Sequence, residues 1–333
     1  PPEGAVELPS YAEVSAPTGE GKKAFTKAFQ LFSANQDPVT AKCLFQKVDN
    51  RYLVHNPPSP PLESDELDAV HDIKWMLDAP ASIRRQGAIR ALDTIRFGVT
   101  THRGCYGGCR FCATKTGIPL APDPSEPEQL AESVRLMGLR HVVVTSVTRD
   151  DLPDGGAQHW AATVEAIRRK NPDATIELLI PDLDARADLI EIVAASKPDI
   201  IGHNIETVER LTPLVRSRAK YRTSLRTLEI ISASGAVSKS GLMVGLGESD
   251  DEVLQTLRDL RNVGVEIVTL GQYLRPSLEH YPVAAYITPE KFEWYRLQAL
   301  EMGFSYCASA PMVRSSYLAD AALESVKRKI AEQ

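Results

Sequence analysis

A regular alternation of short β-branched runs with helix-length amphipathic segments begins near residue 95 and continues almost to the end of the chain. This alternation predicts a parallel sheet, because each helix carries the chain back to the edge where the next strand starts. The units recur at roughly 25–40-residue spacing, about the length of a βαβ unit. We therefore expect an α/β fold that forms a full or partial (β/α) barrel, with a doubly wound open sheet as the alternative.

In both architectures the chemistry lies at the carboxyl ends of the strands, so the loops that follow the strands are the places to search. Strands are expected at 93–100, 141–145, 175–180, 200–204, 237–244, 267–273 and 305–308, and helices at 127–137, 157–170, 187–196, 224–234, 252–263 and 289–302.

The first 94 residues do not follow this pattern. Proline and polar residues recur, and residues 56–61 read Asn-Pro-Pro-Ser-Pro-Pro, a run that cannot lie inside a helix. Short helices are expected only at 22–33 and 64–77. We expect an irregular, Pro-rich N-terminal extension over 1–94 that packs on a core of 95–320, and a C-terminal tail over 321–333.

Three of the five cysteines, Cys105, Cys109 and Cys112, fall within eight residues on the loop after the first core strand. The glycines at 104, 107 and 108 let the backbone curl, so that three thiolates can converge on one object. Such clustering favours metal or cofactor ligation over disulfides. Three cysteines on a four-iron cluster leave one iron free to bind a small molecule through an amine and a carboxylate.

Two other interpretations of these cysteines remain open. A zinc site would use His102 as the fourth ligand. A redox-active thiol pair, or buried cysteines without a ligand, would need no metal. Phe111 lies between two of the cysteines, where it could shield a cluster or stack on an adenine ring.

The spacing C-x3-C-x2-C resembles the signature of the radical S-adenosylmethionine (SAM) superfamily. The resemblance implies a barrel of the radical SAM type, a 4Fe–4S cluster held by the three cysteines, and SAM at the open iron. It also implies a reducing electron donor and reductive cleavage of SAM to a 5′-deoxyadenosyl radical that abstracts hydrogen from a substrate. Because the cluster and SAM carry this chemistry, we expect no further catalytic side chain.

Later strand ends carry further polar residues. Asp150, Asp151 and Asp154 place three carboxylates at one strand end, although Asp154 could instead cap a helix in a solvated turn. Asn204 and Glu206 are two residues apart, so an extended backbone would turn both toward one side. There they could hold an ammonium and a carboxylate group, or cap the following helix.

Two arginines and two glycines add weaker signals. Arg216 and Arg218 could clamp a carboxylate with paired hydrogen bonds, or lie solvated on the surface. Gly245 and Gly247 would let the backbone approach a ligand closely, but a lone G-x-G is a weak motif.

Residues 109 to about 320 closely resemble the lipoyl synthase family. The matching blocks are 109–112, 145–156, 203–207, 239–248, 271–277 and 314–317, in the proper order. The resemblance implies a sulfurtransferase of lipoate biosynthesis, which inserts two sulfurs into an octanoyl chain on a lysine of a lipoyl carrier protein or domain. It further implies that Asn204, Glu206 and Arg216 contact SAM, and that Ser315 ligates an auxiliary cluster.

One feature of that family is missing from this sequence. Lipoyl synthases carry a second cysteine trio, spaced C-x4-C-x5-C, upstream of the first, and its cluster is the sulfur source. Upstream of Cys105 this chain offers only Cys43, and the family's motif places no ligand at Cys307. We therefore expect no second 4Fe–4S cluster, and a hydrogen-abstracting barrel without the family's sulfur source.

Residues 1 to about 112 instead resemble the YgiQ-type radical SAM proteins, through the segments 8–14, 51–58 and 101–105. The changeover falls inside the cysteine trio, which both families share. We interpret the sequence as a composite chain joined at that motif.

The sequence thus predicts a radical SAM enzyme resembling lipoyl synthase. The alternatives are a radical SAM enzyme with another substrate and an inactive metal-binding barrel. The formal net charge of −6 argues against nucleic acid as a partner. No run of about 18 apolar residues exists to span a membrane. Reduced thiols and an oxygen-sensitive cluster favour the cytoplasm, and the resemblance also allows the mitochondrial matrix.

Overall fold

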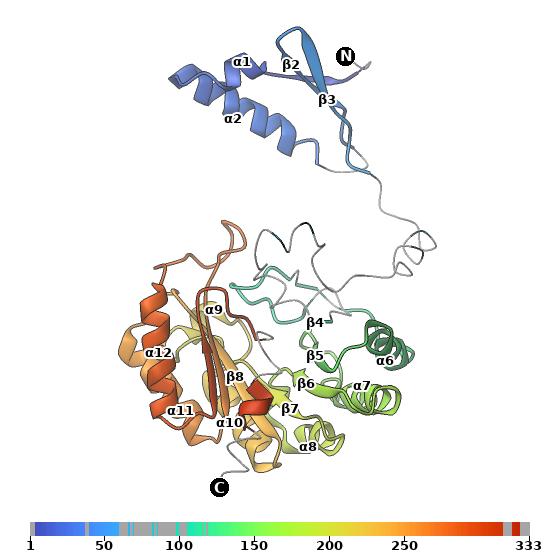
Figure 1. The fold of residues 1–333 in the computed structure, drawn as a ribbon, viewed down its shortest axis with the longest axis vertical. Coiled ribbons are helices and arrows are strands. Elements are labelled where there is room, and N and C mark those ends of the chain that lie inside the picture. The colour runs from blue at the N-terminus through green and yellow to red at the C-terminus, as the bar shows by residue number, and fades with distance from the viewer. Residues whose placement is uncertain are drawn as a thin grey trace. The chain divides into compact units, whose positions relative to one another are not determined.

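The computed structural model describes residues 4–36, 40–59, 98–99, 105–114, 116–117, 119–315 and 322–326, together with the single residues 66, 69, 82 and 85. The chain divides into two compact units, Pro1–Trp75 and Met76–Gln333 (Figure 1).

The N-terminal unit contains a three-stranded sheet in the order β1 (Val6–Leu8), β2 (Leu44–Val48) and β3 (Arg51–His55). β1 runs parallel to β2, and β3 runs antiparallel to it after a two-residue turn. The first residue of that turn, Asp49, has a φ of +52°, as hairpin turns of this length require. This sheet was not predicted, so the extension holds more regular structure than its composition suggested.

Two helices accompany this sheet, α1 (Tyr11–Val14) and α2 (Gly19–Ser33). Each begins at a hydroxyl side chain that accepts a hydrogen bond from the first helical turn: Ser10 for α1 and Thr18 for α2. The helix expected at 22–33 therefore exists and starts three residues earlier, at the residue after its cap. The helix expected at 64–77 lies almost wholly outside the described residues.

The second unit is built on a sheet of seven described strands. In chain order they are β4 (Gly98–Val99), β5 (His141–Thr145), β6 (Thr175–Leu179), β7 (Ile200–Gly202), β8 (Val237–Val244), β9 (Ile267–Gln272) and β10 (Tyr306–Ser309). Each strand pairs in parallel with the next one in the chain. A doubly wound sheet would reverse this order at a switch point. The order confirms the parallel β/α units of the expected full or partial barrel, and in the described part of the chain β4 and β10 form the two ends of the sheet.

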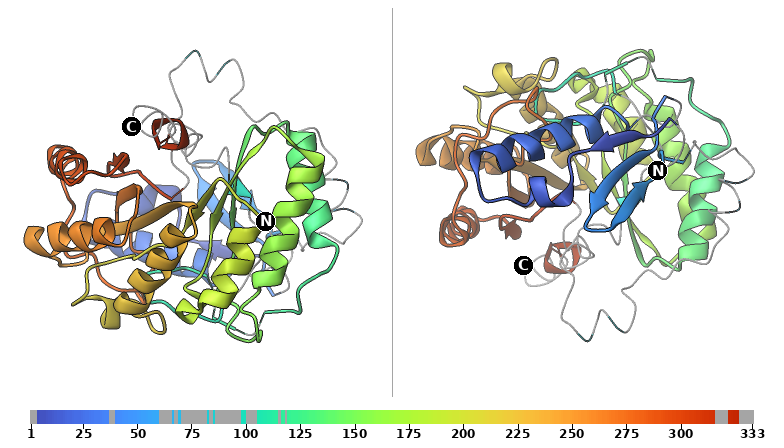
Figure 2. Two further views of the ribbon diagram at one scale, coloured as in Figure 1. Left: turned by 90° about the horizontal axis from the view of Figure 1, so that it is seen from below. Right: turned by 90° about the horizontal axis from the view of Figure 1, so that it is seen from above.

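The connecting helices lie on the outer side of the sheet (Figure 2). Their bounds are α6 (Glu126–Met137), α7 (Ala157–Lys170), α8 (Ala187–Ala195), α9 (Thr212–Val215), α10 (Tyr221–Ala233), α11 (Asp250–Asn262) and α12 (Pro289–Glu301), with a 3₁₀ turn η1 (Leu183–Ala185). The six expected helices are all present within three residues of their expected bounds. The two short elements, η1 and α9, were not predicted.

Alternation along the strands separates the outer core from the interior of the barrel. On β5, Val142 and Val144 pack with apolar residues of α6, α7 and α8. The first residue of β5, His141, lies instead near Glu177 of β6, which forms an ion pair with Lys239 of β8. The barrel interior therefore holds charged residues between its apolar layers.

A short helical segment, residues 322–326, closes the end of the barrel where the strands begin. Ala322, Leu323 and Val326 form one buried cluster with Ile200 and Ile267, the first residues of β7 and β9. The described part of the C-terminal tail is thus part of the core. This packing covers the starts of β7 and β9, at the end of the sheet opposite the carboxyl ends of the strands.

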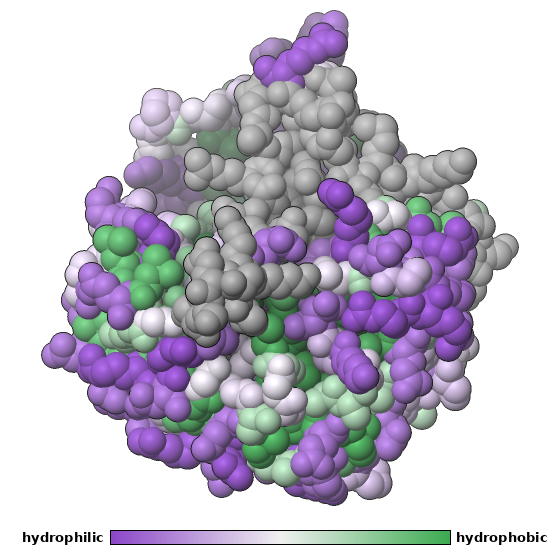
Figure 3. All heavy atoms as spheres, turned by 60° about the horizontal axis from the view of Figure 1, so that its bottom comes forward, coloured by the Kyte–Doolittle hydropathy of each residue, from purple (hydrophilic) through white to green (hydrophobic). Residues whose placement is uncertain are grey.

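The outer surface gives no sign of a membrane-crossing element. On the face drawn in Figure 3, the described apolar residues gather in separate groups between hydrophilic ones. Within the described ranges, no helix combines the length and the apolar character needed to cross a bilayer.

Candidate functional site

In the cysteine loop, residues 105–114, the thiols of Cys105 and Cys109 both lie close to Gly107. A Cβ placed on Gly107 would lie 3.4 Å from Sγ of Cys105 and 3.7 Å from Sγ of Cys109. A side chain at Gly107 would therefore contact both sulfurs. The Gly107 amide also donates a hydrogen bond of 3.3 Å to the sulfur of Cys105.

The third thiol lies on the same loop, at the mouth of the barrel. The amide of Cys112 donates to the carbonyl of Cys109 at 3.2 Å, and its sulfur accepts a 3.4 Å hydrogen bond from the amide of Thr114. All three cysteines are half-buried. Amide-to-sulfur hydrogen bonds of this kind stabilise thiolates that ligate iron–sulfur clusters.

Three cysteine thiols on one loop are the donors that iron–sulfur clusters take. In the part of the chain that the structure describes, no group of three or more His, Cys, Asp and Glu side chains is arranged to hold one metal ion. A four-iron cluster takes each thiolate on a different iron, so the sulfurs need not meet at one point. The zinc alternative depends on His102, which lies outside the described residues.

Burial raises the pKa of the Cys109 thiol, so the free protein does not favour the thiolate there. The backbone of Ser217 and the charge of Arg216 act in the opposite direction. The Ser217 hydroxyl donates to the carbonyl of Gly107, and the Arg110 amide donates to the carbonyl of Val215 at 2.9 Å. The segment after α9 therefore holds the cysteine loop against the barrel.

A pocket of about 280 Å³ opens where β7, β8 and β9 end. Five of the residues singled out from the sequence line it together: Phe111, Cys112, Asn204, Glu206 and Ser315. The remaining lining residues are Gly241, Leu242, Met243, Thr269, Gly271, Gln272, Tyr273, Leu274, Val313 and Arg314. The structure thus brings one cysteine of the trio together with three of the four residues that the resemblance assigned to SAM or a cluster.

Asn204 fits in this pocket only because a glycine faces it. A Cβ on Gly241 would lie 2.9 Å from Oδ1 of Asn204 and 2.6 Å from Oγ1 of Thr269. The amide nitrogen of Asn204 donates a hydrogen bond of 2.9 Å to Oγ of Ser315, 111 residues away. This bond connects the loop after β7 with the loop after β10, across two intervening strands.

Glu206 reaches the pocket by a route other than the extended backbone we expected. Its φ is +66°, an uncommon left-handed conformation for a residue with a side chain. Two backbone hydrogen bonds to β8 hold it there: its amide donates to Gly241 at 3.0 Å, and its carbonyl accepts from Met243 at 2.8 Å. Such local strain is common where a side chain must be aimed at a ligand.

Arg216 lies behind Glu206 and does not line the pocket. Its guanidinium is buried and donates to the carbonyl of Ile205 at 3.2 Å and to Oγ of Ser224 at 2.9 Å. Burial raises the pKa of Glu206, whereas the charge of Arg216 and a hydrogen bond from Asn204 lower it. The charge of Arg216, which lies outside the pocket lining, therefore favours the ionised form of the Glu206 carboxylate.

Ser224, which accepts a hydrogen bond from Arg216, also contacts the buried ring of His203. Nδ1 of His203 lies 3.0 Å from the carbonyl of Ile180, and Nε2 lies 2.8 Å from Oγ of Ser224. Burial, together with the charge of Arg216, lowers the pKa of His203 to about 3, so the ring is neutral. Since the carbonyl can only accept, Nδ1 carries the hydrogen and Nε2 accepts from the Ser224 hydroxyl.

The carboxylates after β5 stabilise loops. Asp154 accepts from the amides of Gly156 at 3.0 Å and Gln158 at 3.1 Å, at the start of α7, as the capping alternative predicted. Asp151 accepts two 2.9 Å hydrogen bonds from Arg149.

Asp150 forms a 3.2 Å ion pair with Arg218. The Arg218 guanidinium lies 4.4 Å from the ring centre of Tyr106, next to Cys105. Arg218 therefore links the loop after β5 to the cysteine loop. It does not line the pocket.

The remaining sequence candidates lie elsewhere. Cys307 is buried within β10, and burial raises the pKa of its thiol to about 12, so it stays protonated. Cys43 belongs to the N-terminal unit. The carboxylate of Glu248 accepts from the amides of Gly245 and Leu246, so this G-x-G turn binds its own side chain.

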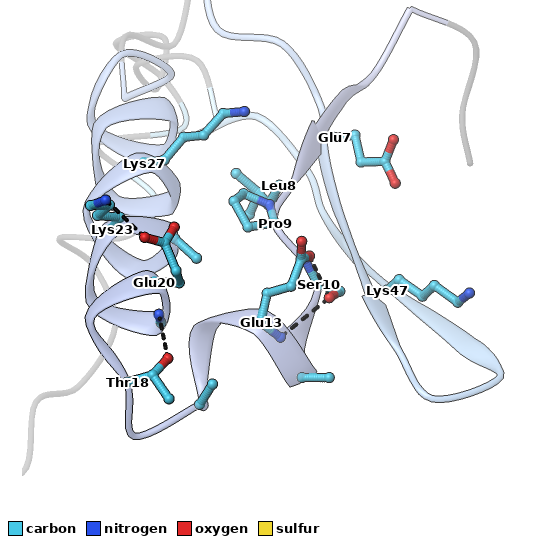
Figure 4. A pocket seen from close by; sticks show the side chains of 14 residues that line it. Glu7, Leu8, Pro9, Ser10, Glu13, Thr18, Glu20, Lys23, Lys27 and Lys47 are labelled. Atoms are coloured by element: carbon cyan, nitrogen blue, oxygen red, sulfur yellow. Dashed lines mark hydrogen bonds and ion pairs between the residues drawn. The ribbon is translucent and has the colours of Figure 1, made fainter.

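A larger cavity, of about 930 Å³, lies in the N-terminal unit between the end of β1, α1 and α2 (Figure 4). Its labelled side chains carry both charges, and Glu20 and Lys23 pair at 2.8 Å. Neither a thiol nor an imidazole is among the residues that line it: Glu7, Leu8, Pro9, Ser10, Ala12, Glu13, Ala16, Thr18, Glu20, Gly21, Lys23, Ala24, Lys27 and Lys47. This cavity is larger than the pocket in the barrel, but only the barrel pocket is lined by a cysteine. We therefore take the barrel pocket as the candidate functional site.

Two family profiles match this chain and meet at residues 98 and 99, shortly before the cysteine loop. The profile of the Radical SAM superfamily matches residues 99–260, and the Radical SAM N-terminal profile matches residues 1–98. A lipoyl synthase of Parabacteroides distasonis is 54% identical over 216 residues, which are 65% of this chain and 77% of the relative. Lipoyl synthases of Bacteroides thetaiotaomicron and Treponema denticola are 55% and 50% identical, over 65% of this chain and 77% and 74% of their own lengths.

Solved structures share the fold at low identity. Methylornithine synthase (PylB) superposes with a TM-score of 0.52 at 12% identity, over 70% of this chain and 80% of that chain. SuiB of Streptococcus suis bound to S-adenosylmethionine gives 0.51 at 10% identity, over 64% of this chain and 49% of that chain. At such identities the likeness supports the architecture alone.

Proposed function

Because the chain belongs to the lipoyl synthase family, we propose that Cys105, Cys109 and Cys112 hold one 4Fe–4S cluster beside the barrel pocket, with SAM at the open iron. The function of the chain is that of a radical SAM enzyme related to lipoyl synthase. The observation that carries the proposed site is that Cys112 shares a pocket with Phe111, Asn204 and Glu206.

Each residue has a task in this proposal. The three thiolates bind iron, and Asn204 and Glu206 bind the amino acid end of SAM through an amide and a carboxylate. Phe111 covers the cluster or stacks on the adenine ring. Arg216 keeps Glu206 ionised and therefore able to hold an ammonium group. When bound, the cluster and SAM supply the radical that removes hydrogen from the substrate.

The proposed substrate is an octanoylated lipoyl carrier protein or domain, and a reducing electron donor is the second partner. The support is the match to lipoyl synthases over about three quarters of their length. We place the protein in a reducing compartment, the cytoplasm or the mitochondrial matrix, since cluster cysteines must stay reduced.

We propose a single cluster for this chain. Outside the trio, the sequence contains only Cys43 and Cys307, and Cys307 is buried in β10. Ser315, which we assigned to an auxiliary cluster from the resemblance, is hydrogen-bonded to Asn204. The sequence therefore lacks a second set of three cysteines for a further 4Fe–4S cluster.

Iron and sulfide quantification after anaerobic reconstitution tests this proposal. We expect about four irons per chain, and a reduced electron paramagnetic resonance signal that changes when SAM is added. Replacement of the trio by alanine should abolish iron binding, whereas Cys307→Ala should retain it. Eight irons per chain, or zinc in place of iron, would contradict the proposal.

The N-terminal match to a different radical SAM profile favours a second candidate, a radical SAM enzyme with another substrate. An assay on an octanoylated carrier domain separates the two. Transfer of hydrogen from the octanoyl chain to 5′-deoxyadenosine supports the first, because that step needs no sulfur source. Cleavage of SAM without that transfer supports the second.

A further inference from the structure

The segment that joins β9 to α12, residues 273–288, connects the pocket with the cysteine loop. At its start, Tyr273 and Leu274 line the pocket. The hydroxyl of Tyr273 donates to the carbonyl of Tyr281 at 2.7 Å, and Nε of Arg275 donates to the carbonyl of His280 at 2.9 Å. These bonds fold the segment back, so that its middle reaches the cysteine loop.

His280 makes the most direct of these contacts. Its Nε2 lies 3.0 Å from the carbonyl oxygen of Cys112, 168 residues away, and its Nδ1 lies 2.8 Å from Oγ of Ser277. Because a carbonyl only accepts, Nε2 must carry a hydrogen and donate it to Cys112. The hydroxyl of Ser277 can donate to or accept from Nδ1, so it fixes the ring in this orientation.

The neighbouring residue adds a second anchor. The amide of Tyr281 donates to the carbonyl of Arg110 at 2.8 Å, and the Arg110 guanidinium lies 5.6 Å from the centre of the Tyr281 ring. The carbonyl groups of Arg110 and Cys112, the residues before and after Phe111, thus accept hydrogen bonds from adjacent residues of the 273–288 segment. No local sequence signal indicated this contact.

We propose that His280 is a positioning residue, which fixes the backbone of Cys112 and thereby the direction of its thiol. Both ring nitrogens have partners, so His280 is not itself a cluster ligand. Because the same segment forms part of the pocket wall, a ligand that moves Tyr273 or Leu274 would also act on Cys112. The link to a cluster rests on the proposed function; the link to the loop does not.

The effect of His280 on Cys112 can be tested in the cluster-free protein under anaerobic conditions. Iodoacetamide alkylates the cysteines, and mass spectrometry gives the alkylation rate of each one. His280→Ala should speed alkylation of Cys112 roughly fivefold relative to Cys105, as expected for the loss of one hydrogen bond. His280→Gln should restore most of the protection, because its amide can donate in place of Nε2. His159→Ala, which removes a 2.9 Å contact to Glu126 between α6 and α7, is the matched control.

The cluster is tested in the reconstituted protein. His280→Ala should lose iron faster on incubation with a chelator and change the electron paramagnetic resonance signal, and His159→Ala should do neither. Equal changes at all three cysteines would indicate general unfolding and overturn the proposal, as would an unchanged Cys112 rate. If the unmodified protein takes up no cluster, the proposed function fails, while the alkylation result still decides the role of His280.

Discussion

The ammonium group of Lys239 lies 2.6 Å from a carboxylate oxygen of Glu177, and both side chains are nearly inaccessible, at 3% and 1% exposure. The two residues lie on β8 and β6, so the pair spans β7 inside the barrel. Burial raises the pKa of Glu177, and the charge of Lys239 opposes this effect. Two residues further along β8, Gly241 lines the pocket. The ion pair therefore lies one layer below the candidate site.

Removal of one residue of the Lys239–Glu177 ion pair should lower the free energy of unfolding strongly. Lys239→Met leaves a buried carboxylate without its counter-charge and should lower the free energy of unfolding by about 3–5 kcal/mol. Lys239→Met combined with Glu177→Leu should lose much less, because no uncompensated charge remains. Urea unfolding of the cluster-free protein at pH 7 measures both. As a control, Arg226→Met breaks the exposed pair with Glu229 on α10 and should change little; a similar loss in the double variant would count against this account.

The contact between Arg216 and Ser224 predicts an effect on SAM binding. Ser224→Ala removes the 2.9 Å acceptor of the Arg216 guanidinium and the partner of His203. The freed guanidinium should support Glu206 less well, and the dissociation constant for SAM should rise roughly tenfold, as for the loss of one charged hydrogen bond. Calorimetric titration of the reconstituted protein measures it. Ser196→Ala, at the end of α8, provides the control, and equal SAM affinity in the two variants would argue against the proposed link.

Protonation of Glu252 at low pH should reduce the stabilisation that its carboxylate gives to the start of α11. Hydrogen bonds from Arg210, and then from the amide of Ser249, lower the pKa of Glu252 to about 2, from an ordinary value of 4.5. Because the folded pKa lies below the unfolded one, the stabilisation is full above pH 4.5 and is lost as the pH falls toward 2. The difference in thermal midpoint between the cluster-free parent and Glu252→Gln should therefore shrink from pH 5 to pH 2. A difference that stays constant over this range would contradict the assignment.

The barrel could be predicted from the sequence because its strands and helices differ in period. β5 and β8 have the expected bounds, and α7 does as well. Strands of a parallel sheet are buried on both faces, so they form short apolar runs that stand out between amphipathic helices. The strands of the N-terminal unit lack this contrast: every residue of β3 is exposed, and β1 has only three residues.

The site was only partly predictable, for a different reason. Motif spacing identified Cys112, Asn204 and Glu206, and the structure places all three in one pocket. It did not identify His280, which contacts the carbonyl of Cys112 from 168 residues away, or Ser224, which contacts Arg216 behind the pocket. The left-handed φ of Glu206 was also unexpected, because it depends on pairing with β8. Such long-range contacts leave no local sequence pattern.

The close approach of Gly241 to Asn204 gives the most direct test of the pocket. In Gly241→Ala, the new methyl group would meet Oγ1 of Thr269 at 2.6 Å and Oδ1 of Asn204 at 2.9 Å, so Asn204 must turn away. Side-chain ends can move more easily than backbone, and we expect the barrel to fold. SAM affinity should fall by at least about tenfold, since Asn204 loses its place and its bond to Ser315.

Gly19→Ala is the control for this substitution, because a Cβ at Gly19 would meet nothing within 4 Å. Both variants should keep the circular dichroism spectrum and, after reconstitution, about four irons, which a cluster held by the cysteine trio alone requires. Only Gly241→Ala should lose SAM binding in equilibrium dialysis. If Gly241→Ala binds SAM as tightly as the parent, Asn204 does not contact SAM and the pocket has another ligand. If it instead loses iron, the pocket and the cysteine loop are more tightly coupled than the contacts through His280 and Tyr281 imply.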